Sequence, residues 1–223
     1  MAKQAAVRVY LEAGHTRVFA CALDWPGWCR RAKTEEAALE ALADYASRYA
    51  IVAKRAGLSF AAANSTLEVV ERISARPKGT FSYVDFGALG EPAAADRASL
   101  SAADAKKQTA ILQAAWAVLD DTVARAPEQL RKGPRGGGRD RDAVVAHVVA
   151  AETAYARKLG VRHKEPATAD AVAALRAEIA QTLAGARAGE PPVTSGWLPR
   201  YAARRIAWHV LDHAWEIDDR STS

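Results

Sequence analysis

The sequence predicts an α+β fold in which a small β-β-α-β-β unit precedes an all-α four-helix bundle. Three observations support this prediction. Apolar and polar residues alternate in the first part of the chain, helical periodicity replaces the alternation in the second part, and a stretch rich in Gly, Ala and Pro separates the two. The 223 residues, half of them apolar, are enough for one large domain or two small ones.

The first two strands form a predicted hairpin. Alternation over 7–13 and 17–25 surrounds Gly14 and His15, as in two antiparallel strands joined by a tight turn. A Pro-Gly dipeptide at 26–27 then ends the second strand. The chain is therefore expected to open with a β-sheet.

One long helix is expected next. Thr34 is a predicted N-cap because two glutamates follow it directly, and acidic residues favour the first turn of a helix. Apolar residues at helical spacing continue to Gly57, a natural C-cap, so the helix is predicted over 35–56. Two further β-rich runs, 65–74 and 80–87, complete the predicted order of elements.

The second half of the chain is predicted to be helical throughout. Residues 87–103 carry no periodic pattern and have the composition of an interdomain linker. We place the boundary near Ala93, with an α+β domain over 1–92 and a helical domain over 93–223 that is expected to fold alone. The predicted helices of the bundle are 102–126, 140–159, 168–187 and 198–219.

Composition and charge disfavour several classes of protein. No apolar run approaches the ~20 residues that cross a bilayer, and the N-terminus lacks the apolar block of a signal peptide, so a cytoplasmic protein without a membrane partner is expected. The net charge of +5 is a small excess spread over both signs and does not indicate nucleic-acid binding. Cys21 and Cys29 are expected to be buried thiols in a reducing compartment, without a disulfide.

Three histidines on two predicted helices form a candidate metal site. His209 and His213 are four residues apart, so their side chains lie on one face of a helix and can share one ion. His147 lies on the inward stripe of another helix, and three neutral imidazoles suit a divalent metal with one position left open. The alternative is that each histidine is a core residue bonded to a neighbouring carbonyl or carboxylate. Glu152 and Asp212 are candidates to accept the second ring N–H of a ligand, or are surface acids.

Two segments of the second half resemble a known family. RDAVVAHVVAAE and RIAWHVLDHAWEIDD are similar to the second- and fourth-helix motifs of the DinB/YfiT-like superfamily of metalloenzymes, and the resemblance covers about residues 100–220. In that family one histidine on the second helix and two on the last helix bind a divalent metal, and His147, His209 and His213 match these positions. The resemblance implies a bound divalent metal, and imidazole donors suit Zn, Ni, Fe or Cu, of which Zn or Ni is expected. It also implies a low-molecular-weight thiol, because members include thiol-dependent isomerases and S-transferases.

The first half resembles a different family. The segment CALDWPGWCRRAKTEEAALEALADYASRY is similar to the core of HicB-type antitoxins, in which a Pro-Gly turn precedes a Thr-Glu-Glu-Ala helix start. This resemblance covers about residues 5–55. It implies a small α+β module that binds a partner or forms a homodimer, while a helical region stands where HicB proteins often carry a DNA-binding motif.

The start of the last predicted helix is rich in positive charge. Arg200, Arg204 and Arg205 crowd its first turns, which is unfavourable against the helix dipole unless acids or an anionic ligand compensate. We therefore expect Arg200 and Arg204 to bind an anionic substrate or a thiol carboxylate. Trp197 is expected to form the wall of this binding site.

The predicted metal site and the resemblance to the DinB/YfiT-like superfamily favour an enzyme over a non-catalytic protein. The favoured function is a divalent-metal-dependent enzyme, either a thiol-dependent transferase or isomerase or a hydrolase, that acts on an anionic small-molecule substrate. The alternative is a non-catalytic, partner-binding or antitoxin-like regulatory protein. Serine-hydrolase chemistry is not supported, because the chain has no GxSxG motif.

Overall fold

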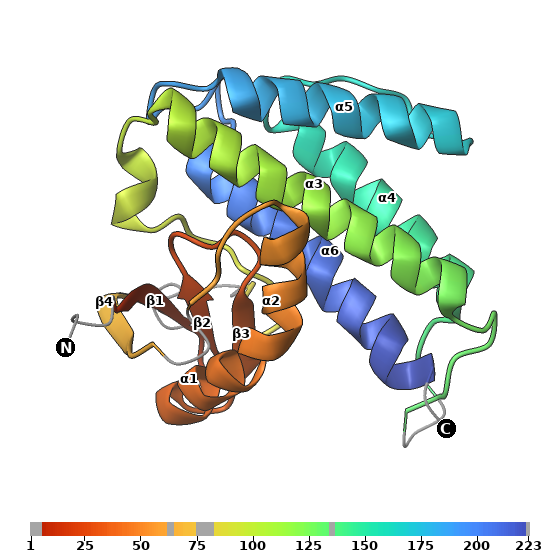
Figure 1. The fold of residues 1–223 in the computed structure, drawn as a ribbon, viewed down its shortest axis with the longest axis horizontal. Coiled ribbons are helices and arrows are strands. Elements are labelled where there is room, and N and C mark those ends of the chain that lie inside the picture. The colour runs from red at the N-terminus through yellow and green to blue at the C-terminus, as the bar shows by residue number, and fades with distance from the viewer. Residues whose placement is uncertain (1–5, 62–64, 75–82, 134–136, 222–223) are drawn as a thin grey trace.

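A four-stranded sheet and two shorter helices come first in the chain, and four longer helices follow (Figure 1). The α+β class predicted from the sequence is confirmed. This computed structural model describes residues 6–61, 65–74, 83–133 and 137–221. In chain order the elements are β1 (Val7–Ala13), β2 (Val18–Ala22), β3 (Cys29–Ala32), α1 (Glu35–Asp44), α2 (Ala46–Arg55), β4 (Leu67–Ser74), the 3₁₀ helix η2 (Ala94–Arg97), α3 (Ala102–Arg125), α4 (Arg141–Arg157), α5 (Ala169–Gly185) and α6 (Pro199–Ser221).

Both faces of the sheet are covered. The strand order is β3-β2-β1-β4, with β1 and β4 parallel and the other pairs antiparallel. Val9 and Leu11 of β1 share one core with apolar residues of α1 and α2. Glu12 points to the opposite face, because successive side chains of a strand alternate, and it pairs in register with Phe19. The Phe19 ring meets Trp208 of α6 edge to face, with 5.5 Å between centroids, so this second face of the sheet lies against α6.

Helix α6 is buried over most of its length because several elements cover it. It packs against α3 and α4, and in Figure 1 α5 lies on the side of α3 away from the sheet. The Pro-Gly turn that precedes β3 also contacts α6. Gly27 has a left-handed conformation (φ 90°), and a Cβ atom there would lie only 2.7 Å from Leu211 Cδ1. Apolar residues of the sheet, of α1 to α5 and of α6 thus belong to one continuous core.

The four helices of the second half were well predicted. Helices α3 to α6 begin and end within two residues of the expected positions. Ser101 caps α3 by accepting a hydrogen bond from the Asp104 N–H at 3.0 Å. Among the described residues, no helix is both long enough and apolar enough to cross a membrane.

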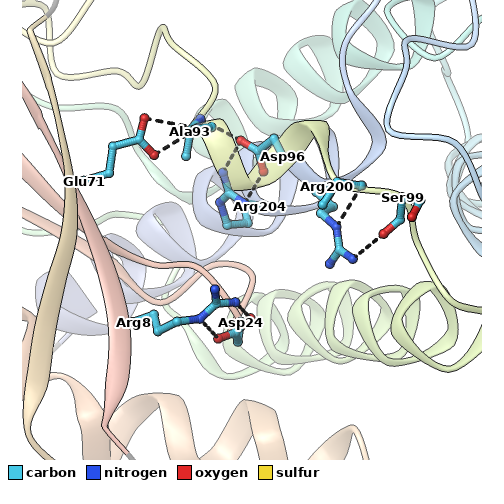
Figure 2. Close-up of polar contacts among 10 residues, drawn as sticks. Arg8, Asp24, Glu71, Ala93, Asp96, Ser99, Arg200 and Arg204 are labelled. Atoms are coloured by element: carbon cyan, nitrogen blue, oxygen red, sulfur yellow. Dashed lines mark hydrogen bonds and ion pairs between the residues drawn. The ribbon is translucent and has the colours of Figure 1, made fainter.

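The segment that composition assigned to a flexible linker is packed against both halves of the protein. Three of its apolar residues are buried: Leu89, Ala93 and Leu100. Asp96 of η2 is fully buried and forms an ion pair with Arg204 of α6, while Glu71 of β4 accepts the Ala94 N–H at 2.9 Å (Figure 2). Composition does not reveal these contacts, because the partners of η2 lie far away in the sequence.

Strand β3 was not expected from the sequence. The Pro-Gly turn sends the chain back antiparallel to β2, so the Ala22 N–H donates to the Trp28 carbonyl at 3.0 Å and Cys29–Ala32 continue the pairing. The strand has four residues, which is too short for alternation to be recognised.

The strand predicted over 80–87 is wrong for its described part. Residues 80–82 lie outside the described residues, and 83–87 form turns in which Gly87 has φ 86°. Asp85 accepts the N–H groups of His15 and Thr16 at 3.0 and 2.7 Å. The turn preferences of Asp and Gly therefore outweigh the alternation here. The observed order is β-β-β-α-α-β instead of β-β-α-β-β.

The helix predicted over 35–56 exists but is interrupted at Tyr45, which separates α1 from α2. Its start is confirmed, since the Thr34 hydroxyl accepts the Ala37 N–H at 3.2 Å. The Tyr45 ring contacts Trp215 of α6 edge to face, at 5.1 Å between centroids. The interruption between α1 and α2 therefore lies beside α6.

The expectation for the two cysteines was wrong. Cys21 of β2 and Cys29 of β3 are register partners on adjacent strands and form a disulfide. Both are buried. Spacing and compartment alone do not reveal this pairing, because it depends on β3, which brings the two residues opposite each other.

Candidate metal centre

Three imidazole rings meet where α4 packs against α6. His147 comes from α4, and His209 and His213 come from α6; one potential ligand atom of each lies within 4.8 Å of the others. The ring centroids are 4.6 Å apart for His209 and His213, 5.2 Å for His147 and His209, and 5.0 Å for His147 and His213. The structure thus brings together the three histidines that were predicted as ligands. We call them the three-His cluster.

The cluster follows from helix geometry. Residues four apart differ by about 40° around a helix, so His209 and His213 lie on the same face, one turn apart. On α4, the buried Val144 and Val148 hold the helix against the core on either side of His147. The packing of α4 on α6 then brings His147 to the pair.

Burial keeps two of the three rings neutral. Desolvation lowers the pKa of His209 well below its ordinary value, and the nearby charges of His213 and Arg205 lower it further. Burial, followed by the charge of His213, also lowers the pKa of His147. Neutral imidazole is the form that binds metal, so these rings are prepared for ligation without first losing a proton.

Glu216 orients the third ring. Nδ1 of His213 lies 2.8 Å from a carboxylate oxygen of Glu216, and Arg220 donates to the other oxygen at 2.7 Å. The hydrogen bond to His213 holds the pKa of Glu216 below its ordinary value, so the group is an acceptor and Nε2 of His213 carries the lone pair. Sequence reasoning missed this role of Glu216, although its spacing of three residues from His213 was a usable signal.

The two acids considered for that role are bound elsewhere. Glu152 is buried, accepts a hydrogen bond from the Trp116 indole, and forms an ion pair with Arg176 at 3.1 Å. Asp212 forms an ion pair with Arg30 of β3 at 3.0 Å. Both acids therefore serve contacts between elements and do not orient a ring of the cluster.

A buried nitrogen of the cluster lacks a partner. Nδ1 of His209 is inaccessible and has no hydrogen-bond partner among the described residues. Such an atom costs free energy unless something satisfies it. Nitrogens about 2.1 Å from one tetrahedral zinc ion are about 3.4 Å apart, so the rings have to approach by up to about 1.4 Å to ligate together. The donor set and the unsatisfied atom fit a divalent ion.

Arg200 and Arg204 lie on a different side of α6. At about 100° per residue, Arg200 is about 180° and Arg204 about 140° around the helix from His209. Arg204 pairs with Asp96 (Figure 2), and Arg200 pairs with Asp104 at 3.2 Å. Protein acids therefore already compensate the two arginines that were predicted to bind an anion.

The ring of Tyr155 separates Trp197 from the three-His cluster. The Tyr155 ring of α4 is 4.9 Å from Trp197 and 5.6 Å from His209, centroid to centroid. Trp197 and Tyr201 also border a cavity of about 250 Å³. An aromatic wall thus connects this cavity with the cluster.

Arg205 and Glu12 are two further polar residues close to this wall that the sequence did not single out as a pair. Arg205 precedes His209 by one helical turn and lies on the same face of α6. Glu12, at the end of β1, is fully buried against the same region. The spacing of four residues was a signal for Arg205, whereas the position of Glu12 depends on how the sheet packs on α6.

Comparisons with known proteins add no assignment. No family model matches the chain, and no curated protein or solved structure matches it. The resemblances to the DinB/YfiT-like and HicB families therefore stay predictions from short motifs.

Proposed function

We propose that the protein is a divalent-metal-dependent enzyme whose ion is held by His147, His209 and His213. The main supporting observation is the convergence of three ring nitrogens from two helices within 4.8 Å. A histidine retained only for packing finds a hydrogen-bond partner inside the core, whereas Nδ1 of His209 has none among the described residues. On this proposal, α3 to α6 form a four-helix bundle of the DinB/YfiT type, and the sheet is a HicB-like module.

Zinc or nickel suits the cluster best. The donors are imidazole nitrogens, which bind these ions well, while Mg²⁺ and Ca²⁺ prefer oxygen ligands. When bound, such an ion acts as a Lewis acid and makes a thiol or a water molecule that reaches it more acidic.

The residues of the chain prepare the site for this chemistry. Glu216 fixes the ring of His213, and burial keeps His147 and His209 unprotonated. His213 retains 14% exposure of its side chain, which leaves the cluster accessible from outside. A thiol-dependent transfer or isomerisation uses such an accessible position, and so does hydrolysis by water. The family resemblance favours the thiol reaction.

Metal content tests the proposal directly. Protein purified without an affinity tag is expected to contain about one zinc or nickel ion per chain by elemental analysis. Replacing His147, His209 or His213 by Ala should lower the content, and the triple variant should abolish it. His163→Ala is the matched control, because His163 pairs with Glu178 at 2.7 Å away from the cluster. A triple variant with the metal content of the natural sequence would show that the ion is bound elsewhere.

Cobalt substitution tests the thiol reaction. If a thiol binds the ion held by the cluster, adding glutathione, mycothiol or bacillithiol to the cobalt form should produce a sulfur-to-cobalt charge-transfer band in the near ultraviolet. The His209→Ala variant is expected to show no band. Full cobalt occupancy without a band for any of the three thiols would rule out the thiol reaction and leave hydrolysis.

A further inference from the structure

Among the described residues, one arginine at the start of α6 forms no ion pair with an acid. Arg200 pairs with Asp104 and Arg204 pairs with Asp96, but Arg205 forms no ion pair with a described residue. Arg205 is only 7% exposed, and its Nη1 has no hydrogen-bond partner in the described part of the chain. A buried cation without a direct ion pair is costly, so this position calls for a further acceptor from outside the chain.

The surroundings of Arg205 hold its side chain beside the three-His cluster. The guanidinium carbon lies 4.9 Å from the centre of the Tyr155 ring and 4.7 Å from that of Trp208. His209 follows one turn later on the same face of α6, and the Tyr155 ring contacts it as well. Aromatic faces stabilise the cation, and the N–H donors of its Nη1 stay available to an acceptor.

A second unsatisfied polar atom belongs to Glu12, whose carboxyl interacts electrostatically with Arg205. Oε1 of Glu12 accepts the N–H groups of Gly90 and Glu91 at 2.9 and 3.0 Å, but its buried Oε2 has no hydrogen-bond partner among the described residues. Burial raises the pKa of Glu12 to about 7, against the lowering effects of the two backbone donors and of Arg205. The charges of the two side chains thus interact, although the side chains form no ion pair. Two buried, unsatisfied atoms on β1 and α6 indicate a polar group between them that the chain does not supply.

A cavity lies beside neighbours of both residues. The cavity of about 250 Å³ is bordered by Gly90, whose N–H binds Glu12, and by Tyr201, which precedes Arg205 by one turn of α6. Trp197 borders the same cavity and contacts Tyr155. The cavity therefore reaches the residues that flank Glu12 as well as those that flank Arg205.

We propose that Arg205 binds the carboxylate of a small organic acid, which lies between the sheet and α6 beside the three-His cluster. A guanidinium matches a carboxylate with two parallel hydrogen bonds. The aromatic walls favour a flat, apolar body, and the negative charge of Glu12 disfavours a second carboxylate, so the ligand is a monocarboxylate. Binding of the acid by Arg205 does not depend on the proposed function. Only the further step, that this acid is a substrate of the metal site, rests on it.

Benzoate is the probe for this site, and calorimetry on the full-length, metal-free protein at pH 8 is the measurement. The natural sequence should bind benzoate saturably at millimolar concentrations and should not bind the uncharged benzyl alcohol. Arg205→Gln is expected to weaken binding about tenfold or more, because it removes a charge-assisted hydrogen-bond pair. Arg162→Gln, at an exposed position, is the charge-matched control and should leave binding unchanged.

Two further variants keep the test decisive if Arg205→Gln folds poorly. Arg205→Lys keeps the charge but loses the planar fork, so it should also bind benzoate more weakly. Glu12→Gln should bind benzoate several-fold more tightly at pH 8, because it removes an ionised carboxylate facing the same cation. A purely structural role of Arg205 predicts no effect of Glu12→Gln on benzoate.

The outcomes separate this inference from the metal proposal. No saturable binding of benzoate, or equal affinity in the Arg205 variants, overturns the inference and leaves a buried water between Arg205 and Glu12. Zinc content is measured on the same variants as purified, before the metal is removed for calorimetry. If zinc binds and benzoate does not, only the carboxylate site is wrong. If benzoate binds through Arg205 and zinc does not bind the three-His cluster, only the metal proposal is wrong.

Discussion

Glu216 contacts the ring of His213 but is not itself one of the three histidines of the cluster. Its removal therefore tests how the orientation of that ring affects metal binding, without removing a ligand. Glu216→Ala deletes the acceptor of the His213 Nδ1–H, 2.8 Å away, and leaves all three imidazoles in place. Loss of such an acceptor typically lowers metal affinity about 10–100-fold, because the ring loses its fixed orientation and some of its basicity. Competition with a chromophoric zinc chelator measures the change.

The matched control for this experiment is Glu178→Ala. It removes the acid that pairs with His163 at 2.7 Å, outside the cluster. Zinc affinity should stay unchanged in that variant. Equal affinity in Glu216→Ala and the natural sequence would mean that Glu216 serves only its ion pair with Arg220.

Glu12 makes the stability of the protein depend on pH. Its carboxyl has an ordinary pKa of 4.5, which burial raises to about 7 in the folded state, while Glu91 raises it and Arg205 lowers it to a smaller extent. The folded state therefore holds the proton more tightly than the unfolded state. The stability that this group contributes is complete below pH 4.5, falls as the pH rises from 4.5 to about 7, and is lost above that.

Glu12→Gln should abolish this pH dependence. The amide oxygen can still accept the N–H groups of Gly90 and Glu91, but the side chain no longer ionises. The variant is expected to be more stable than the natural sequence at pH 8 by up to about 3 kcal/mol and similar to it at pH 4.5. Urea unfolding at the two pH values measures the difference, and an equal difference at both would contradict a buried, titrating Glu12.

The candidate site was predictable only where it depends on a single helix. The spacing of His209 and His213 predicts a shared face, and the inward stripe of α4 adds His147. Glu216 and Arg205 are on the same helix at spacings of three and four residues, so the same reasoning could have included them. Glu12 was beyond reach, because its position depends on the second face of the sheet meeting α6.

At the scale of elements, the segment around η2 fastens the sheet to α6. The buried Asp96 pairs with the guanidinium of Arg204 and caps the Ala93 N–H at 2.8 Å. Asp96→Ala leaves Arg204 as a buried, unpaired cation, so the free energy of unfolding should fall by about 3–5 kcal/mol. Urea unfolding of the full chain measures the loss.

The size of that loss is tested against two other variants. Glu71→Ala removes an exposed acceptor of the Ala94 N–H and should cost about 1 kcal/mol. The double variant Asp96→Leu with Arg204→Met replaces the pair by apolar groups and should regain most of the lost stability. A cost below about 1 kcal/mol for Asp96→Ala would show that this pair does not hold the segment in place.

The same contrast explains which elements the sequence predicted. Helices α3 to α6 are long and periodic, so their positions follow from local pattern alone. Strand β3 and the segment 87–101 have no such pattern, because pairing with β2 and the ion pair of Asp96 determine their conformation. The turns over 83–87 show the reverse case. Alternation is present there, but Asp85 and Gly87 determine the turn conformation.

At the scale of the whole molecule, α6 belongs to both halves of the chain. It packs on α3 and α4 on one side, while Trp208 meets Phe19 of the sheet and Leu211 lies against the turn at Gly27. The three-His cluster and Arg205 are on this shared helix. The sheet therefore covers part of the surface of the helix that carries the candidate site.

This arrangement qualifies the expectation that the helical part folds alone. A fragment over 93–223 keeps the helix-forming sequences and should show a helical circular dichroism spectrum. It also exposes the surface of α6 around Trp208, and removing contacts to a buried aromatic side chain costs about 3–5 kcal/mol. The fragment should therefore melt at a lower temperature than the full chain and bind a hydrophobic dye, and adding the separate 1–92 fragment should reverse both effects. A fragment that melts cooperatively at the temperature of the full chain, without dye binding, would show that α6 needs no support from the sheet.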